Sequence, residues 1–510
     1  MRPVTTATIN LATFLHQAAD RLPGKPALIH GEAMTTWSAM RRRVGAIAAA
    51  LGERGIKKGD RIVVQSRNRL SMFESMWVCW TLGAVWVPVN FRLMPEDVAY
   101  VARQSGGVLM LAEDVFADHV AATGLPVIGM GEEWEALASG DAQLRPVAVE
   151  RDDPAWFFYT SGTTGRPKAG VLTHGQLAFV VTNHLADLMP SLNDRDDCSL
   201  VVAPLSHGAG LHQMVQVVRG VPTVLLEGAR FDPAEVFRLV ETHRVTNMFT
   251  VPTILKMLAE SPSAGEHDHS SLRHVIYAGA PMTRADQRHA LETLGPCLVQ
   301  YYGMGEVSGN ITVLTTWMHS TDDAAHPIGS CGVPRSGVDI SIQDDNGNEL
   351  ERGQDGEVCV RGPAVFAGYW DNDEANAKSF RDGWFRTGDL GHMDERGLVH
   401  LTGRASDMFI SGGSNIYPLE IEEKIAEHEQ VRDVAVFGLP DEKWGEIGVA
   451  ALVVEDGFDE AAFAAWMRER IAAYKVPRRI EVFDALPTSG YGKVTKKLVR
   501  EAVEARDSTA

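Results

Sequence analysis

Short apolar runs of strand length recur along the first part of the chain, with helix-like stretches between them. The runs that match buried strands are 108–111, 199–203, 223–226, 247–251, 274–278 and 298–302. Stretches 233–243 and 253–259 instead place apolar residues at helical spacing. Strands that alternate with helices predict parallel sheets joined by crossover helices, so the expected fold class is α/β.

The pattern of apolar and turn residues changes after Gly332. Strand-like runs separated by turn residues predict a small β-rich subdomain there: 338–343, 356–361 and 398–402. A domain boundary is expected near Gly403 and Arg404. A small α+β domain is predicted beyond it from a hairpin, a helix and a strand: 408–411, 418–428 and 431–438. The expected domains are therefore residues 1–403 and 404–510.

The length and charge of the chain limit the kinds of molecule that it is expected to bind. The chain has 510 residues, too many for one hydrophobic core, and a formal net charge of -19. That acidic balance argues against nucleic acid and against anionic membrane surfaces as partners. The longest apolar stretch, 77–91, contains Gly83, Pro88 and Asn90 and is too short and too broken to span a bilayer. No transmembrane segment is therefore expected.

The cysteines and the N-terminus bear on the compartment. The five cysteines lie far apart and form no Cys-x-x-Cys pair, so neither a zinc site nor a disulfide framework is indicated. The N-terminus lacks the charged and apolar regions of a signal peptide. These features favour a reducing, cytoplasmic location. The oligomeric state stays open, with a homodimer as one alternative.

The run Tyr-Thr-Ser-Gly-Thr-Thr-Gly-Arg-Pro-Lys-Ala-Gly at 159–170 follows the apolar strand 155–158. Its glycines let backbone N–H groups approach an anion, its hydroxyls add donors, and Arg166 and Lys168 add positive charge. Such a loop is suited to a polyphosphate, although a Gly/Thr hairpin without a ligand is the alternative. It is not a Walker A loop, because Lys168 follows Pro167 and precedes Ala169. Pro167 predicts an extended loop between two strands.

The loop resembles the phosphate loop of the adenylate-forming superfamily, which includes acyl-CoA synthetases, aryl-CoA ligases, luciferases and peptide-synthetase adenylation domains. Further strings resemble the same superfamily in its order, over nearly the whole chain: 204–210, 277–282, 300–306, 384–391, 402–413 and 486–494. The resemblance implies an ATP-dependent acid–CoA ligase with a small mobile C-terminal domain. Such an enzyme forms acyl-AMP with release of pyrophosphate and then transfers the acyl group to coenzyme A.

The resemblance also implies the residues of an ATP site. The β and γ phosphates would be held by Thr160, Ser161, Gly162, Thr163, Thr164, Gly165 and Lys168. Adenine would be held by Gly279, Ala280, Pro281, Tyr302 and Gly303, and ribose by Asp389 and Arg404. Glu306 matches the family's magnesium ligand, and a hard carboxylate oxygen suits Mg²⁺ bridged to phosphates. Taken alone, the small residues at 278–281 indicate close packing, and Thr-Gly-Asp at 387–389 is a common turn.

Lys493 matches the family lysine that bridges the acid and the α-phosphate, although a solvated surface lysine is the alternative. A positioned ammonium offsets the repulsion between two anions and stabilises the charge that develops at the phosphate. With Glu306 and His207 it makes up the predicted catalytic set. Ser406 matches the hinge position, and Gly412 and Gly413 match the loop along which the pantetheine arm passes.

The acid pocket implied by the family comprises His207, Gly210, Val251, Ala280 and Met304. These residues include no cation that could pair with a second carboxylate, so an aliphatic or aromatic monocarboxylate is expected. His207 would gate the pocket, although a histidine capping a helix is the alternative. A metal pair of His207 and His212 is disfavoured, because a spacing of five does not place both on one helix face and no third ligand follows.

The chain departs from the family pattern at several positions. These are Ala169 and Gly170 after the loop lysine, Ser206 before the histidine, Ala278, Gly305 and Ser406. Gly305 stands where the family has a threonine that touches the α-phosphate, so one hydrogen bond is in doubt and extra space is expected there. Gly303, Gly305 and Gly309 also mimic a dinucleotide fingerprint, but no acidic residue on a following strand supports a nicotinamide cofactor.

Two alternative functions remain from the sequence. One is an adenylating enzyme that delivers the acyl group to a carrier protein or another acceptor instead of coenzyme A. The other is a binding protein of the same fold without catalysis, which the presence of Lys493, Glu306 and Asp389 disfavours.

Overall fold

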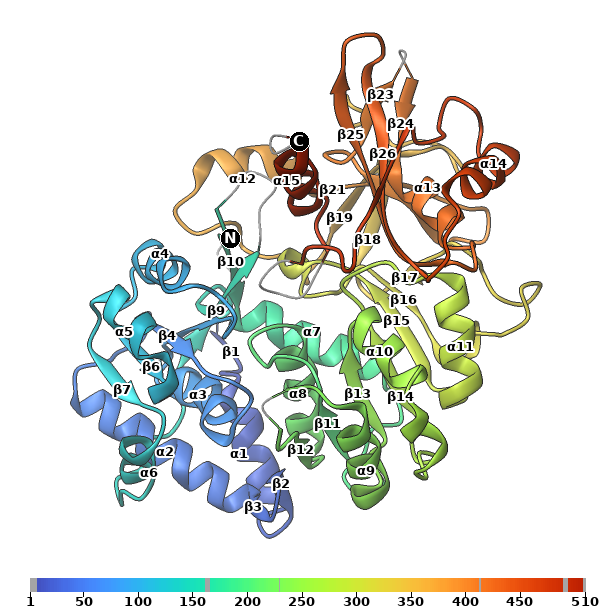
Figure 1. Cartoon of the computed structure of the whole chain (residues 1–510). Helices are drawn as coiled ribbons and strands as arrows, with labels where there is room; N and C mark the ends of the chain where they lie inside the picture. The colour runs from blue at the N-terminus through green and yellow to red at the C-terminus, as the bar shows by residue number, and fades with distance from the viewer. Residues whose placement is uncertain (1–6, 161–165, 229, 412–413, 489–493, 508–510) are drawn as a thin grey trace. The chain divides into compact units, whose positions relative to one another are not determined.

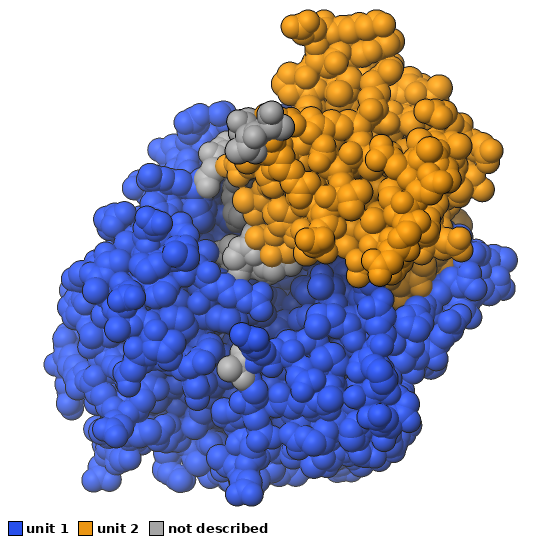
Figure 2. Space-filling view, in the orientation of Figure 1, with its two compact units in different colours: residues 1–281, 288–339, 360–385 blue, residues 282–287, 340–359, 386–510 orange. Residues whose placement is uncertain are grey.

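The computed structural model describes residues 7–160, 166–228, 230–411, 414–488 and 494–507. The chain divides into two compact units, coloured separately in Figure 2. The first unit comprises residues 1–281, 288–339 and 360–385, and the second comprises 282–287, 340–359 and 386–510. The domain boundary expected at residues 403 and 404 stays a prediction.

The larger sheet of the first unit has the strand order β17-β16-β15-β14-β13-β11-β12-β2-β3 (Figure 1). Its strands are β2 (Pro26–His30), β3 (Ala33–Thr36), β11 (Ser199–Val201), β12 (Thr223–Leu225), β13 (Asn247–Thr250), β14 (His274–Tyr277), β15 (Leu298–Tyr302), β16 (Thr312–Leu314) and β17 (Val333–Pro334). The strands from β15 to β2 in this order are parallel. Helices α8 (Gly208–Arg219), α9 (Pro233–His243), α10 (Pro252–Ala259) and α11 (Arg284–Leu294) connect them. The predicted α/β alternation is confirmed.

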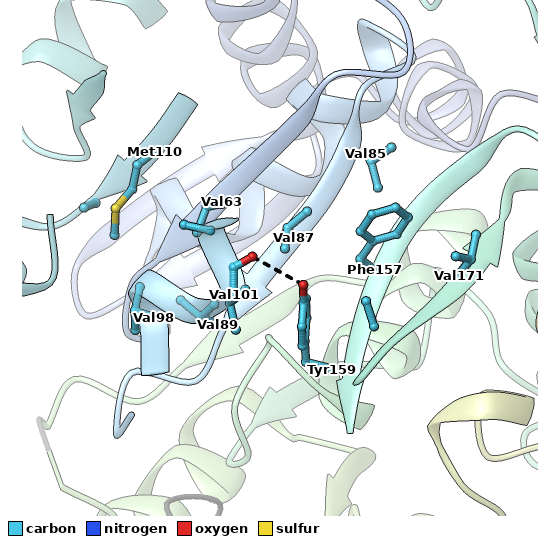
Figure 3. Packing of buried hydrophobic residues seen from close by; sticks show 13 residues of the cluster. Val63, Val85, Val87, Val89, Val98, Val101, Met110, Phe157, Tyr159 and Val171 are labelled. Atoms are coloured by element: carbon cyan, nitrogen blue, oxygen red, sulfur yellow. Dashed lines mark hydrogen bonds between the residues drawn. The ribbon is translucent and has the colours of Figure 1, made fainter. Parts of the chain in front are cut away.

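A second sheet of the same unit has the order β10-β9-β5-β4-β6-β7. Its strands are β4 (Arg61–Gln65), β5 (Val85–Val89), β6 (Leu109–Ala112), β7 (Val127–Gly129), β9 (Pro154–Thr160) and β10 (Lys168–Thr173). Val63, Val87 and Phe157 belong to the buried apolar cluster beside it (Figure 3). In that cluster the Tyr159 hydroxyl donates a hydrogen bond to the Val101 carbonyl at 3.3 Å (Figure 3). Strands buried on both faces explain why β4 and β5 are almost uniformly apolar.

The other helices and short strands of this unit are α1 (Ala12–Arg21), α2 (Trp37–Glu53), α3 (Leu70–Thr81), α4 (Pro95–Ser105), α5 (Ala117–Thr123), α6 (Glu132–Ala138), α7 (His174–Asp187), α12 (Asp373–Ser379), β1 (Ala7–Thr8) and β8 (Val149–Glu150). Helix α7 begins directly after β10 with a capping box formed by Thr173 and Gln176. Both side chains satisfy backbone N–H groups at the first turn, so the chain changes from strand to helix at one residue. No helix within the described ranges is long and apolar enough to cross a membrane.

The β-rich stretch predicted after Gly332 forms a sheet of order β18-β19-β21-β20, with β22 paired to β21. The strands are β18 (Asp339–Gln343), β19 (Gly356–Arg361), β20 (Phe380–Arg381), β21 (Trp384–Met393) and β22 (Val399–Arg404). Strands β21 and β22 are antiparallel, with Asp389 directly opposite Arg404.

The C-terminal part of the second unit is a sheet of order β24-β23-β26-β25, with β27 paired to β26. Its elements are β23 (Phe409–Ser411), β24 (Ser414–Ile416), α13 (Pro418–Ile425), β25 (Val431–Asp441), β26 (Gly445–Val454), α14 (Glu460–Arg470), β27 (Arg479–Val482) and α15 (Lys496–Asp507). Along β25, Ala435 and Phe437 belong to one apolar cluster and Val436 to another, as expected when successive side chains face opposite sides. The α+β prediction is confirmed, although α13 ends earlier than expected and β25 extends further.

Candidate functional site

The carboxyl ends of β11, β13, β14 and β15 lie at the same edge of the larger sheet, because these neighbouring strands are parallel. The loops that follow them carry His207, Val251, Gly279 to Pro281, and Tyr302 to Glu306. This edge is where ligands bind in open α/β sheets. The structure therefore brings the predicted adenine residues, acid-pocket residues and magnesium ligand together on one side of the sheet.

Glu306 lies in the short helix η3 (Gly305–Val307), which contacts both β9 and β10 of the second sheet. The residue is 6% exposed. Its Oε1 accepts hydrogen bonds from the Thr160 hydroxyl at 3.0 Å and from the Tyr369 hydroxyl at 2.8 Å. Among the described residues, no hydrogen bond is made to Oε2. Two neutral donors, the hydroxyls of Thr160 and Tyr369, thus hold Oε1 of the carboxylate.

Tyr369 is a site residue that the sequence analysis missed. The segment around it runs along β10, where the Ala367 and Trp370 N–H groups donate to the Val171 and Ala169 carbonyls. The Tyr369 ring centroid lies 5.2 Å from Nζ of Lys168. Tyr369 therefore touches both the predicted phosphate lysine and the predicted metal ligand. The only local sequence signal is Gly-Tyr-Trp at 368–370, which does not indicate pairing with β10.

The flanks of the predicted phosphate loop are the antiparallel strands β9 and β10, with Thr160 opposite Lys168. The two ends of the loop are thus held side by side. The loop's other cation, Arg166, has its guanidinium carbon 5.2 Å from the Tyr100 ring centroid. Ser161, Gly162, Thr163, Thr164 and Gly165 lie outside the described residues.

The expectation of extra space at Gly305 is wrong. A Cβ atom on Gly305 would lie 2.6 Å from Cδ1 of Phe158 and 2.8 Å from Cγ2 of Thr160. The two side chains of β9 already fill the volume that a larger residue would need. Gly303 is equally constrained, because its Cβ would lie 2.5 Å from the Gly309 backbone. The glycines of this loop therefore reflect close packing, not a dinucleotide fingerprint.

We expect Gly305→Ala to lower the free energy of unfolding by about 1–3 kcal/mol, which is typical of an overpacked site. The added methyl would have to displace Phe158, whose ring lies 5.3 Å from that of His207 in the predicted acid pocket, so the KM for the acid should rise as well. Urea unfolding and acid-dependent pyrophosphate release measure the two effects. Gly265→Ala is the matched control, since no heavy atom lies within 4 Å of its Cβ position. Equal behaviour of the two variants would contradict the prediction.

His207 occupies the N-cap position of α8, but its side chain makes no capping hydrogen bond. Its ring meets the Phe158 ring edge-on, with the centroids 5.3 Å apart, and its Nδ1 lies 3.0 Å from Oγ of Ser206. The Phe158 ring lies 5.4 Å from the Trp156 ring. Phe158 thus lies beside both His207 and Gly305, the residue before Glu306.

Small residues after His207 allow further rings to approach the turn. A Cβ on Gly208 would lie 2.6 Å from Cζ of Phe249, and one on Gly210 would lie 3.0 Å from the Trp156 ring. The rings of Phe249 and Tyr301 are stacked, 6.0 Å apart. We call the residues 203–210 the His207 turn and the rings of Trp156, Phe158 and Phe249 the aromatic wall. The sequence analysis predicted the turn but missed the wall.

His212 belongs to a buried polar network instead of facing His207. Its Nε2 lies 2.8 Å from Oδ1 of Asn247 and 3.2 Å from Nε2 of Gln216. Burial lowers the pKa of His212 to about 4, so the ring is neutral near neutral pH. Among the described residues, no group of His, Cys, Asp and Glu has the arrangement of a metal site.

The residues predicted for adenine lie in loops after β14 and β15. Ala278 is buried, whereas Gly279, Ala280 and Pro281 are exposed, and Tyr302 is half-buried. Gly279 has φ of +90°, a conformation that residues with a Cβ rarely adopt. The backbone of this turn can therefore lie open to a flat base.

In the second unit, the two predicted ribose residues touch. Nε of Arg404 donates a hydrogen bond to Oδ1 of Asp389 at 2.8 Å, and the Asp389 side chain is 8% exposed. The antiparallel register of β21 and β22 places them opposite each other. Ser406 lies in the turn after β22, and its hydroxyl is 3.3 Å from Oδ1 of Asp407. Gly412, Gly413 and Lys493 lie outside the described residues.

Comparison with known proteins gives matches over nearly the whole chain. Residues 15–370 match the family described as AMP-binding enzyme, and residues 420–493 match the AMP-binding enzyme C-terminal domain. A feruloyl-CoA synthase of Amycolatopsis sp is 38% identical over 488 residues, which cover 94% of this chain and 96% of that protein.

Two solved structures are similar along their whole length. The o-succinylbenzoate CoA synthetase of Bacillus subtilis, in complex with its acyl-adenylate intermediate, is 29% identical with a TM-score of 0.87, covering 98% of this chain and 99% of that chain. The amide bond synthetase McbA of Marinactinospora thermotolerans is 29% identical with a TM-score of 0.86, covering 96% and 99%.

Proposed function

This chain belongs to the AMP-binding enzyme family as an ATP-dependent acid–CoA ligase, and we propose that its acid is an aromatic monocarboxylate. The observation that carries the proposal is the contact between His207 and the aromatic wall. The ring of His207 lies against Phe158, and small residues of the turn let Trp156 and Phe249 approach. Aromatic pairs in edge-to-face or offset contact are favoured beyond the area they bury. Trp156 and Phe249 are buried, whereas Phe158 is half-buried and therefore suits contact with an aromatic acid.

The similarity to feruloyl-CoA synthase supports the same class of acid, since its name describes an aromatic substrate. The pocket residues expected from the sequence, His207, Gly210, Val251, Ala280 and Met304, include no permanent cation. A second carboxylate on the acid would need one, because an unpaired buried charge is costly. A monocarboxylate therefore fits better than a dicarboxylate.

The proposed roles in adenylation depend on the positive charges of two lysines. Lys168 would neutralise the departing pyrophosphate. Lys493 would neutralise the α-phosphate and the attacking carboxylate. Glu306, whose Oε1 is held by two hydroxyls, would hold Mg²⁺ by its carboxylate, which fits the preference of this ion for hard oxygen ligands. When bound, the ion would neutralise phosphate charge. The acid oxygen then forms a bond to the α-phosphorus as the bond to pyrophosphate breaks.

The second half-reaction needs no covalent enzyme nucleophile. The acyl-AMP anhydride already carries a good leaving group, so the coenzyme A thiol attacks its carbonyl and AMP departs. We assign Asp389 and Arg404 to ribose, Gly412 and Gly413 to the pantetheine arm, and Ser406 to the hinge. We propose residues 404–510 as the C-terminal domain, which is supported by the match of residues 420–493 to the family's C-terminal domain. The five cysteines are all buried thiols, which fits a reducing cytoplasm.

Pyrophosphate release against a panel of acids tests the proposal. We expect hydroxycinnamic and other aromatic acids to give a higher kcat/KM than acetate or medium-chain fatty acids. The variant Phe158→Leu removes one ring of the aromatic wall, so it should lower the preference for aromatic acids relative to the wild type. A preference for aliphatic acids in the wild type would overturn the proposal.

The acceptor is tested separately, because an amide bond synthetase is among the structural neighbours. AMP release from the preferred acid should depend on coenzyme A. Release that instead depends on an amine or on a carrier protein would identify the alternative, an adenylating enzyme with another acceptor.

A further inference from the structure

The carboxamide of Asn68 joins two segments that are far apart in sequence. Its Nδ2 donates a hydrogen bond to the Ala203 carbonyl, and its Oδ1 accepts one from the Leu205 N–H, both at 2.9 Å. These two backbone groups flank Pro204 at the start of the His207 turn. Pro204 has no N–H of its own, so Asn68 engages the chain on either side of it.

The backbone that Asn68 holds leads directly to His207. The His207 N–H donates to the Pro204 carbonyl at 3.1 Å, and the Gly210 N–H donates to the His207 carbonyl at 2.8 Å. A Cβ on Gly210 would lie only 2.3 Å from the Leu205 carbonyl oxygen, so the turn is tightly packed. Displacement of Ala203 or Leu205 would therefore displace the imidazole of His207.

The neighbours of Asn68 in its loop are held by Glu113. The Glu113 Oε1 accepts hydrogen bonds from the Arg67 N–H at 2.6 Å and from the Ser66 hydroxyl at 3.0 Å. Its Oε2 lies 2.6 Å from Nε of Arg69. Burial disfavours the charged carboxylate, but the hydrogen bonds from Arg67 and the charge of Arg69 outweigh it and lower the pKa of Glu113. The loop 66–69 is thus fixed on both sides of Asn68.

The two segments belong to different sheets. Loop 66–69 follows β4 and Glu113 follows β6, both in the smaller sheet, and the Glu113 N–H donates to the Gln65 carbonyl at 3.2 Å. The His207 turn follows β11 of the larger sheet. Asn68 therefore links the loop at the carboxyl end of β4 in the smaller sheet to the His207 turn of the larger sheet.

We propose that Asn68 is a positioning residue for the acid, which acts by fixing the His207 turn against the aromatic wall. This inference rests on the proposed function, since it assigns His207 to the acid site. Asn68 does not touch His207 itself, and its effect passes through the backbone of residues 203–205. The inference predicts an effect on the acid and none on ATP.

The matched control is Asn10, another asparagine that ties distant backbone segments together. Its Nδ2 donates to the Trp80 and Val147 carbonyls at 2.7 and 2.9 Å, and its Oδ1 accepts from the Ala12 N–H at 2.9 Å. Asn10→Ala removes three hydrogen bonds to backbone groups, one more than Asn68→Ala, without touching the His207 turn. Both variants should lower the melting temperature, but only Asn68→Ala should change the kinetics of the acid.

The experiment measures acid-dependent pyrophosphate release by the full chain with the preferred acid. We expect Asn68→Ala to raise the KM for the acid about tenfold, as when a positioning group is lost, with the KM for ATP unchanged. Asn68→Gln, which keeps the amide but shifts it by one methylene, should also raise the KM for the acid, and it serves if the alanine variant does not fold. In a His207→Ala background, Asn68→Ala should add no further increase, because the two residues act as one unit.

Independent, multiplying effects of Asn68→Ala and His207→Ala would overturn the inference, as would an equal rise of the KM values for acid and ATP. An active wild type whose KM for the acid is unchanged in Asn68→Ala and Asn68→Gln would overturn this inference alone. A wild type without acid-dependent pyrophosphate release would overturn the proposed function first, and the inference with it.

Discussion

Lys493→Ala is expected to lower acyl-AMP formation by roughly 10²- to 10³-fold, the scale of losing one positioned transition-state donor. Two anions must meet in this step, and at about 4 Å and an effective dielectric of ~20 their repulsion is about 4 kcal/mol. We expect the ammonium of Lys493 to offset that repulsion only during adenylation. Attack of the thiol on acyl-AMP meets no such barrier, so thiolation of supplied acyl-AMP should survive the substitution.

Acid-dependent exchange of pyrophosphate into ATP measures the first half-reaction, and coenzyme A-dependent consumption of synthetic acyl-AMP measures the second. Lys497→Ala is the matched control, because this nearby lysine is 66% exposed and lies 3.9 Å from Glu501. The control should retain both activities. If both half-reactions fell equally in Lys493→Ala, the lysine would not be specific to adenylation.

Strands buried in the parallel sheets were predictable from local sequence. The run 298–302 agrees with β15, and the helical pattern 233–243 agrees with α9. A strand covered on both faces is apolar throughout, and a helix covered on one face keeps a period near 3.6, so both leave a local signal. The run 199–203 was predicted too long, since β11 ends at Val201 and the buried Ala203 already begins the His207 turn.

Contacts between segments far apart in the chain were not predictable. Tyr369 reaches Glu306 because residues 367–370 pair with β10, and no local pattern encodes that pairing. Phe158 fills the space beside Gly305 because β9 passes η3 at that register. The motif comparison led to the opposite expectation, since it treats the loss of a threonine as a gain of space. Side chains of β9, which belongs to the other sheet, fill the space beside Gly305 instead.

For Asp389 and Arg404, the structure adds a contact that the sequence motifs do not indicate. Both were assigned to ribose from separate motifs, and the structure adds that they are a cross-strand pair joined at 2.8 Å. The guanidinium engages Oδ1 and thereby orients the carboxylate. The same arrangement recurs at Glu306, where two hydroxyls hold one oxygen of the carboxylate. In both cases described neighbours orient a carboxylate that is predicted to bind a ligand.

Glu306→Gln is expected to lower kcat/KM for MgATP about 10²-fold, which corresponds to about 2.7 kcal/mol, and to raise the Mg²⁺ concentration needed for half-maximal activity. The amide is isosteric but neutral, so it weakens the attraction to the cation while keeping the size of the side chain. Thr160 and Tyr369 can still donate to its oxygen, and folding should be preserved. A titration of activity with Mg²⁺ at saturating ATP measures the change.

Tyr369→Phe is the companion variant, because it removes the 2.8 Å hydrogen bond to Oε1 and keeps the charge of Glu306. If the charge binds the cation and the hydroxyl only orients it, the magnesium titration should shift much less in Tyr369→Phe than in Glu306→Gln. A titration unchanged in Glu306→Gln would remove this residue from the metal role. Equal shifts in the two variants would mean that orientation of the carboxylate, rather than its charge, limits binding of the ion.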